Sequence, residues 1–126
     1  MPIEYSIDKD LGVVFTTASG VLREYELLEH KRKLTSDPNF KPGFVELSDV
    51  RHISDLSITA GGLHRFVAQD DADADILKDY KLAIVVSGAL EFATGSVYEM
   101  MSLERGTNVR IFRDLDQAKE WLDIRK

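Results

Sequence analysis

The chain has 126 residues and a mass of 14.2 kDa, the size of one domain and enough to bury a core without disulfides. Twenty-two acidic residues outnumber sixteen basic ones, and the net charge of −6 repels a phosphate backbone, so no nucleic acid partner is expected. The absence of cysteine excludes disulfides, thiolate metal sites and a cysteine nucleophile. A single domain over residues 1–126 is the expectation.

No membrane segment is expected. The N-terminus, MPIEYSIDKD, lacks the basic and then apolar pattern of a secretory signal. The longest purely aliphatic run, Leu82 to Val86, is far too short to span a bilayer. A cytoplasmic protein without a membrane span is the simplest interpretation.

The first residues predict an antiparallel hairpin. Ile3, Tyr5 and Ile7 alternate with polar residues, residues 9–12 supply a turn, and a β-branched run follows over residues 13–17. We expect Ser19-Gly20 to end the second strand. A helix should come next, because apolar residues then recur at helical spacing, and it should end by Asp37-Pro38. That apolar stripe consists of Leu22, Tyr25, Leu28 and Leu34.

The stretch from Gly43 to Ser57 predicts a short buried strand, a polar loop and the start of a helix. Phe44, Val45 and Leu47 form the strand, and residues 48–55 are too polar and mixed to continue it. A core-facing helix is expected from Leu56. Open α/β sheets tend to place their binding chemistry in such a stretch, in which a strand leads through a loop into a helix. The apolar stripe of the expected helix is Leu56, Ala60, Leu63 and Val67, with Gly61-Gly62 in the middle.

The second half predicts two more strands and two more helices. Residues 70–75 form an acidic linker, and Leu82 to Val86 reads as a strand buried on both faces. A third helix is expected from the helical spacing of Leu90, Ala93, Val97 and Met101, and a last strand at Val109 and Ile111. Asp114 with Gln117 should cap a final helix. The buried face of that final helix is Leu115, Ala118, Trp121 and Leu122.

The order of elements is β, β, α, β, α, β, α, β, α, which predicts a single α/β domain. Strands alternating with helices imply right-handed crossovers onto a mixed, mostly parallel sheet. The expected architecture is therefore a five-stranded sheet with about four helices and an N-terminal β-hairpin.

These elements and the ending VRIFRDLDQAKEWL resemble the SpoIIAA-like proteins, which are related to the STAS domain. The resemblance covers nearly the whole chain and implies a regulatory or ligand-binding fold. In STAS domains that act as anti-sigma-factor antagonists, a serine after the central strand is phosphorylated by a partner kinase. Aligned without gaps, that serine position falls on Leu56; a one-residue gap moves it to Ser57, without the glycine that follows it in the family.

The candidate binding residues lie in and just after the predicted polar loop. One interpretation is that Ser54, Asp55 or Ser57 caps the following helix. The alternative is phosphorylation, or capture of an anion at the helix N-terminus, where free amides favour negative charge. The full candidate set is Asp49, His52, Ser54, Asp55, Ser57 and Thr59, with Ser57 as the phosphorylation candidate.

No metal, cofactor or enzymatic activity is expected. The three histidines, His30, His52 and His64, are not spaced as zinc ligands, and Ile76 and Leu82 stand where a calcium loop starting at Asp71 requires glycine and glutamate. The chain contains no nucleophile elbow, no P-loop and no dinucleotide-binding glycine motif.

Two functions remain as expectations. The first is a non-enzymatic regulatory domain that contacts a protein partner through the loop at 48–57 and the following helix. The alternative is a binder of a small apolar or lipid-like ligand between the sheet and the helices at 57–69 and 90–104. A homodimer through the exposed hairpin edge is also expected as an option. Further bulky residues are either simple core and sheet-covering side chains or the lining of an apolar pocket or interface: Phe66, Phe92, Tyr98, Met100 and Met101.

Overall fold

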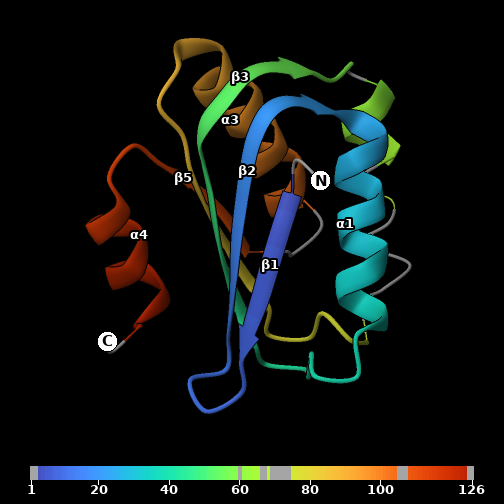
Figure 1. Ribbon diagram of the computed structural model, residues 1–126, viewed down its shortest axis with the longest axis vertical. Helices are drawn as coiled ribbons and strands as arrows, with labels where there is room; N and C mark the ends of the chain where they lie inside the picture. The colour runs from blue at the N-terminus through green and yellow to red at the C-terminus, as the bar shows by residue number, and fades with distance from the viewer. Residues whose placement is uncertain (1–2, 60, 66–67, 69–74, 105–107, 125–126) are drawn as a thin grey trace.

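Five strands form one mixed sheet in which the strands follow one another in chain order (Figure 1). The computed structural model describes residues 3–59, 61–65, 68, 75–104 and 108–124. β1 and β2 are antiparallel, and each later strand is parallel to the one before it. The strands are β1 Ile3–Asp8, β2 Val13–Arg23, β3 Val45–Ser57, β4 Lys81–Val85 and β5 Asn108–Phe112.

Helices cover both faces of this sheet. The three longer helices are α1 Glu24–Ser36, α3 Ala89–Glu104 and α4 Leu115–Leu122, and residues 61–65 form a further helical segment. Side chains of α1, α3 and residues 61–65 share one core with β2, β4 and β5, whereas α4 packs on the other face. Figure 1 shows α4 and α1 on opposite sides of the strands. The predicted α/β fold, with its five strands and N-terminal hairpin, is confirmed.

The order of the strands never reverses, and this changes where a site is expected. Crevices at the carboxyl ends of strands arise where the strand order switches direction. Here each right-handed crossover moves one strand further along, so the helices between parallel strands all lie on the same face. Space for a ligand is therefore to be sought beneath α1 and α3 rather than at a switch point.

The first correction concerns the ends of β2 and α1. β2 does not stop at Ser19-Gly20 but continues to Arg23, with Gly20 at φ +70°. Leu22 is therefore a strand residue, and Tyr25 is 62% exposed rather than buried. α1 begins at Glu24, where the backbone N–H of Arg23 donates to Glu26 Oε1 (3.0 Å), and it ends before Asp37-Pro38, as predicted.

The second correction concerns residues 48–57, which are strand and not loop. β3 runs from Val45 to Ser57 beside β2, and its pairing shifts register twice. Each shift places one additional residue in β3, between Asp49 and His52 and again between Ile53 and Asp55. Extra residues in one strand bend the pair toward the other strand. Beyond the end of β4 the two strands form a curved ribbon, residues 18–23 with 50–57, which arches toward α1 (Figure 1).

The third correction concerns the inner face of α3. Ala93 and Val97 are exposed, Val97 by 46%, so the predicted stripe is wrong at these two positions. Tyr98 and Ser102 are buried instead. A Cβ at Gly95 would lie 2.8 Å from Ile111 Cδ1, so this glycine lets α3 pack closely on β5. The placement of the Leu90 and Met101 side chains lies outside the described part of the chain.

The C-terminal elements match the sequence pattern. Asp114 accepts hydrogen bonds from the backbone N–H groups of Asp116 (2.8 Å) and Gln117 (3.2 Å), and so caps α4 as predicted. Ala118 and Leu122 are buried against β3 and β4, and Trp121 is partly buried beside Phe112. The strand expected at 82–86 is β4, and the strand expected at Val109 and Ile111 is β5.

Candidate functional site: a cavity beneath α1 and α3

A cavity of about 110 Å³ lies between the sheet and the helices of one face. Strands β2, β3 and β4, helices α1 and α3, and the residues Ile58 and Leu63 all contribute to its wall. Its apolar lining residues are Leu22, Leu27, Val50, Ile53, Leu56, Ile58, Leu63, Leu82, Ile84 and Val86, and its polar lining residues are His30, Lys31, Glu46, Ser48, Tyr80, Glu91, Thr94 and Tyr98.

The two register shifts of β3 explain which of its side chains face the cavity. Successive residues of a strand point to opposite faces, so Glu46, Ser48 and Val50 share the cavity side. Each additional residue in β3 reverses that parity. After the first shift Ile53 faces the cavity, and after the second Leu56 does. The ribbon therefore keeps its apolar residues turned inward along its whole curve.

Glu46 is the centre of the polar end of the cavity. It is a strand residue with only 3% of its surface exposed. Thr16 Oγ1 donates to Glu46 Oε2 (2.6 Å), His30 Nε2 donates to the same oxygen (2.9 Å), and the Tyr80 hydroxyl donates to Oε1. An ionised carboxylate only accepts hydrogen bonds, so the proton of the His30 contact lies on Nε2. Groups from β2, α1 and the turn before β4 thus converge on one carboxylate.

These contacts keep Glu46 ionised although it is buried. Burial by itself raises the pKa of this carboxyl, but electrostatic attraction to His30 and the hydrogen bonds from His30, Thr16 and Tyr80 outweigh it and lower the pKa to about 2. The Tyr80 hydroxyl responds in the opposite sense. Its own burial and the nearby Glu46 carboxylate raise its pKa well above the usual range, so the phenol stays protonated.

Lys31 and Tyr98 complete the polar end. The Lys31 side chain comes from the buried face of α1, where the residue is only 4% exposed, and its Nζ lies 3.4 Å from the Tyr98 hydroxyl. Both residues also interact with other groups of the protein. Burial and the charge of Glu46 raise the pKa of Tyr98, so this hydroxyl is also protonated. A ligand at this end would meet two protonated phenols and a buried lysine.

Polar and apolar linings are separated along β3. Glu46 lies next to Val14 and Leu82 near the start of the strand, whereas Leu56 lies next to Leu22 at the tip of the ribbon. Ten residues separate Glu46 from Leu56, and the ribbon curves so that both line one space. Along β3 the lining is therefore polar near Glu46 and Ser48 and apolar under the ribbon.

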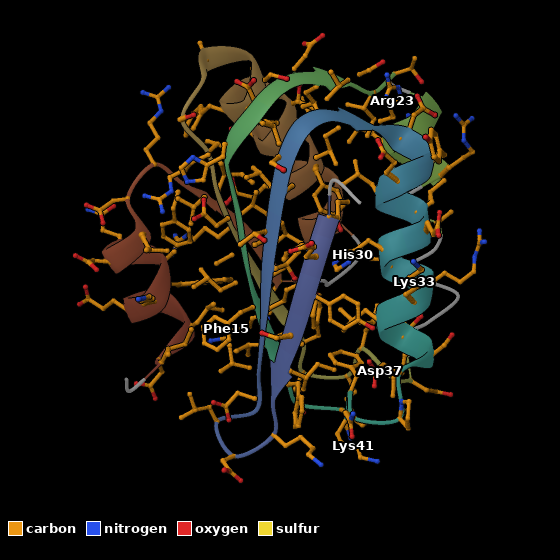
Figure 2. The ribbon with its side chains drawn as sticks, viewed as in Figure 1. Phe15, Arg23, His30, Lys33, Asp37 and Lys41 are labelled. Atoms are coloured by element: carbon orange, nitrogen blue, oxygen red, sulfur yellow. The ribbon has the colours of Figure 1, made fainter. Side chains whose placement is uncertain are left out.

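His30 also separates this cavity from the surface. The same residue lines a surface groove between β1 and α1, together with Tyr5, Tyr25 and Glu29. The His30 ring packs edge-on against Tyr5, with 5.5 Å between ring centroids. Figure 2 shows its side chain between α1 and β1. Its imidazole thus lies between the groove and the cavity and lines both.

The residues predicted from the polar stretch do not line the cavity. Asp49 is engaged with the residue two positions later: Arg51 Nε and Nη2 each donate to its carboxylate at 2.8 Å. The hydrogen bonds of Arg51 hold the pKa of Asp49 below its ordinary value. His52, Ser54 and Ser57 are exposed, as is Asp55, whose carboxylate accepts from the neighbouring Leu56 N–H.

The helix cap predicted at Ser54, Asp55 or Ser57 belongs to Thr59 instead. These three residues are still in β3, and the helical segment starts only at residue 61. Thr59 Oγ1 accepts from the Gly62 N–H (3.0 Å) and donates to Glu24 Oε1 (2.8 Å). Glu24 also accepts from Arg65, so one carboxylate joins α1 to this segment. Of the predicted stripe, Leu63 is buried, Leu56 is strand, and Ala60 and Val67 lie outside the described residues.

Five bulky residues were interpreted either as core side chains or as the lining of a pocket or interface. Tyr98 is buried and lines the cavity. Phe92 is partly buried, with the Arg113 guanidinium 4.3 Å from its ring centroid. Met100 is 66% exposed on the outer side of α3. Phe66 and the side chain of Met101 lie outside the described residues.

The residues that matter most at this site were missed in the sequence. The sequence does mark Glu46 as unusual, because it is the one acidic residue inside the apolar run Phe44-Val45-Glu46-Leu47. Lys31 had a weaker signal, since it falls three residues after Leu28 and three before Leu34 on the inner face of a helix. Nothing in the sequence connects either residue with Tyr80 or Tyr98.

Two other properties follow from the described residues. Within them, no three or more His, Asp or Glu side chains are grouped so as to hold a metal ion. Over the same residues, none of the helices combines the length and apolarity needed to cross a membrane.

Comparison with solved structures agrees with the fold. The chain is similar to an uncharacterized protein of the DUF3478 family from Shewanella loihica PV-4, whose structure is described as having a SpoIIAA-like fold. The TM-score is 0.61 at 21% identity, over 95% of this chain and 93% of the other. No protein-family model and no curated protein matches the chain. The fold is therefore SpoIIAA-like, as the sequence resemblance predicted.

Proposed function

We propose that this protein binds a small, mainly apolar molecule in the cavity beneath α1 and α3. The observation that carries the proposal is the cavity itself, which has a mostly aliphatic wall and a polar end built around Glu46. Sites for small molecules are usually concave and apolar with a few fixed polar groups. No catalytic role is part of this proposal.

The volume limits the size of the ligand. An engineered protein cavity of about 150 Å³ accommodates benzene, so about 110 Å³ suits a molecule of benzene size or slightly smaller. A long-chain lipid would need the wall to open. Of the ligands expected from the sequence, a small apolar molecule is thus favoured over a lipid.

Filling the cavity tests this proposal. Val50→Phe adds a ring at a cavity-lining position, and Val97→Phe adds the same ring on the exposed side of α3 as a matched control. Each variant and the wild type are titrated with benzene and followed by methyl NMR. We expect saturable shifts of the cavity methyl groups in wild type and Val97→Phe, and their loss in Val50→Phe.

Unchanged cavity methyl signals in wild-type protein at saturating benzene would refute the proposal. So would equal binding by Val50→Phe, because the molecule would then occupy another place. Urea unfolding of both variants checks that overpacking, which typically costs about 1–3 kcal/mol, has not unfolded the protein.

A second candidate is a regulatory contact with a protein partner, supported by the outer surface of the ribbon. His52, Ser54, Asp55 and Ser57 are all exposed there, so their side chains are accessible to a partner. Affinity capture with the variant His52→Ala, Ser54→Ala, Ser57→Ala tests it. Asp49 is left unchanged because its loss would release Arg51. An identical set of proteins captured by wild type and variant would count against the contact. Pairing of two copies of the chain through β1 stays a prediction, and measurement of the mass in solution tests it.

A further inference from the structure

We infer that the molecule held in the cavity is uncharged and carries one hydrogen-bonding oxygen. This inference rests on the proposed function and narrows its ligand class. It follows from two features of the polar end: the charges there are already engaged within the protein, and neutral hydroxyl groups line the same space.

Each charged group at the polar end has protein partners. Glu46 accepts from Thr16 and Tyr80, which are buried, and from His30, which is partly buried. Lys31 lies beside the Tyr98 hydroxyl and interacts with other groups as well. A charged ligand would lose its hydration on entering and would meet only charged groups that already contact other parts of the protein.

The other carboxylate in the lining, Glu91, does not alter this balance. It belongs to the first turn of α3 and is only partly buried. The amino end of a helix favours a negative charge, so Glu91 is stabilised where it stands. The partial positive charge at this end of α3 therefore offsets part of the attraction between Glu91 and a cation in the cavity.

Hydroxyl groups supply the recognition that remains. Ser48, Thr94 and Tyr98 line the cavity from β3 and α3. A hydroxyl both donates and accepts hydrogen bonds, and it suits an alcohol or carbonyl oxygen without requiring a charge. With an aliphatic wall around them, these groups match a compact alcohol or ketone.

Four probes of similar size separate the alternatives. Cyclopentanol, cyclopentane, cyclopentylamine and cyclopropanecarboxylate are titrated at pH 7, where the last two are charged, and followed by the cavity methyl signals. We expect cyclopentanol to bind at least tenfold more tightly than either charged probe, and more tightly than cyclopentane.

The outcomes are distinct. Tighter binding of the carboxylate would overturn the inference and assign the site to anions at Lys31, and tighter binding of the amine would assign it to cations at Glu46. Equal affinity for cyclopentane and cyclopentanol would refute the hydrogen-bonding oxygen. Failure of all four probes while benzene still binds would overturn this inference alone, whereas failure of benzene as well would reject the proposed function itself.

Variants locate the recognition. Thr94→Val and Tyr98→Phe remove a hydroxyl while keeping most of the side-chain volume. If either hydroxyl binds the ligand oxygen, that variant narrows the affinity ratio between cyclopentanol and cyclopentane, while the affinity for cyclopentane stays the same. A variant that merely disturbs folding would lose both ligands. An unchanged ratio in both variants and in Ser48→Ala would contradict recognition by these groups.

Discussion

Glu46 is a carboxylate in a place where a carboxylate is costly. It lies inside a strand between two apolar neighbours, and removing an ion from water costs several kcal/mol unless the protein supplies partners. The structure supplies three, from Thr16, His30 and Tyr80. The consequence is a dependence of stability on pH.

Because the folded-state pKa of Glu46, about 2, is below the ordinary value of 4.5, folding favours its ionised form. This contribution is fully present above about pH 4.5 and is lost as the pH falls toward about 2. Glu46→Gln should lower the free energy of unfolding by about 3 kcal/mol at pH 7. Urea unfolding of both proteins should show that this difference shrinks between about pH 4.5 and about pH 2.

The matched control is Glu29→Gln. Glu29 forms an exposed pair with Lys33 on α1 (3.3 Å), and such pairs contribute about 0.5 kcal/mol or less. A difference between wild type and Glu46→Gln that does not vary with pH would mean that folding does not shift the pKa of Glu46, and a difference that grows as the pH falls would mean that the folded carboxyl is protonated.

At this scale the sequence is informative about a residue but not about its partners. An acid within an apolar strand can be recognised as unusual. Its partners come from β2, α1 and the turn before β4, at positions 30, 16 and 34 residues away along the chain. Only the packed fold brings them together, so the site could not be assembled from local spacing.

The β2–β3 ribbon is the element that sequence patterns described least well. A strand is recognised by strict alternation, and β3 reverses its alternation at both register shifts. Its apolar residues then fall at positions 50, 53 and 56, which imitate helical spacing. α4 was predictable because Asp114 and the apolar residues after it are local signals of a capped helix.

The two adjacent glycines of the segment 61–65 should respond differently to alanine. A Cβ at Gly61 would make ordinary contacts with the end of Arg65 (3.5 Å) and with Thr59 Oγ1 (3.8 Å), so Gly61→Ala should raise the free energy of unfolding by up to about 1 kcal/mol through helix propensity. A Cβ at Gly62 would lie 2.6 Å from Glu24 Cδ and displace that carboxylate from Thr59 and Arg65.

We therefore expect Gly62→Ala to give no gain or a loss of stability. Urea unfolding of the two variants in parallel measures the difference, and Gly61→Ala serves as the control for propensity alone. Equal stabilisation by both would show that the Glu24 contacts do not hold the segment against α1.

For the whole molecule, the fold class was accessible from the order of elements. Strands alternating with helices predicted the parallel sheet, and the hairpin supplied its antiparallel edge. The position of the cavity was not accessible, because it depends on how closely α1 and α3 approach the sheet. The close contact of Gly95 with Ile111 is one example, and no sequence pattern at either residue predicts it.

The ribbon has a consequence for motion. Between Glu46 and Asp49, β3 is held by β2 on one side and β4 on the other, but beyond Asp49 its described ladder continues with β2 alone. Ser87 Oγ donates one further bond to the Arg51 carbonyl. Segments with fewer ladders open locally at lower free energy than the sheet that supports them.

Native-state amide hydrogen exchange should therefore show two levels of protection. Paired amides of residues 20–23 and 52–57 should exchange faster than those of 46–49, and cyclopentanol should slow the ribbon selectively. Uniform protection along β3 would contradict this. If the ribbon opens as a unit, it uncovers the cavity while the rest of the sheet stays folded. The rate of this local unfolding then sets how quickly a ligand enters and leaves the cavity.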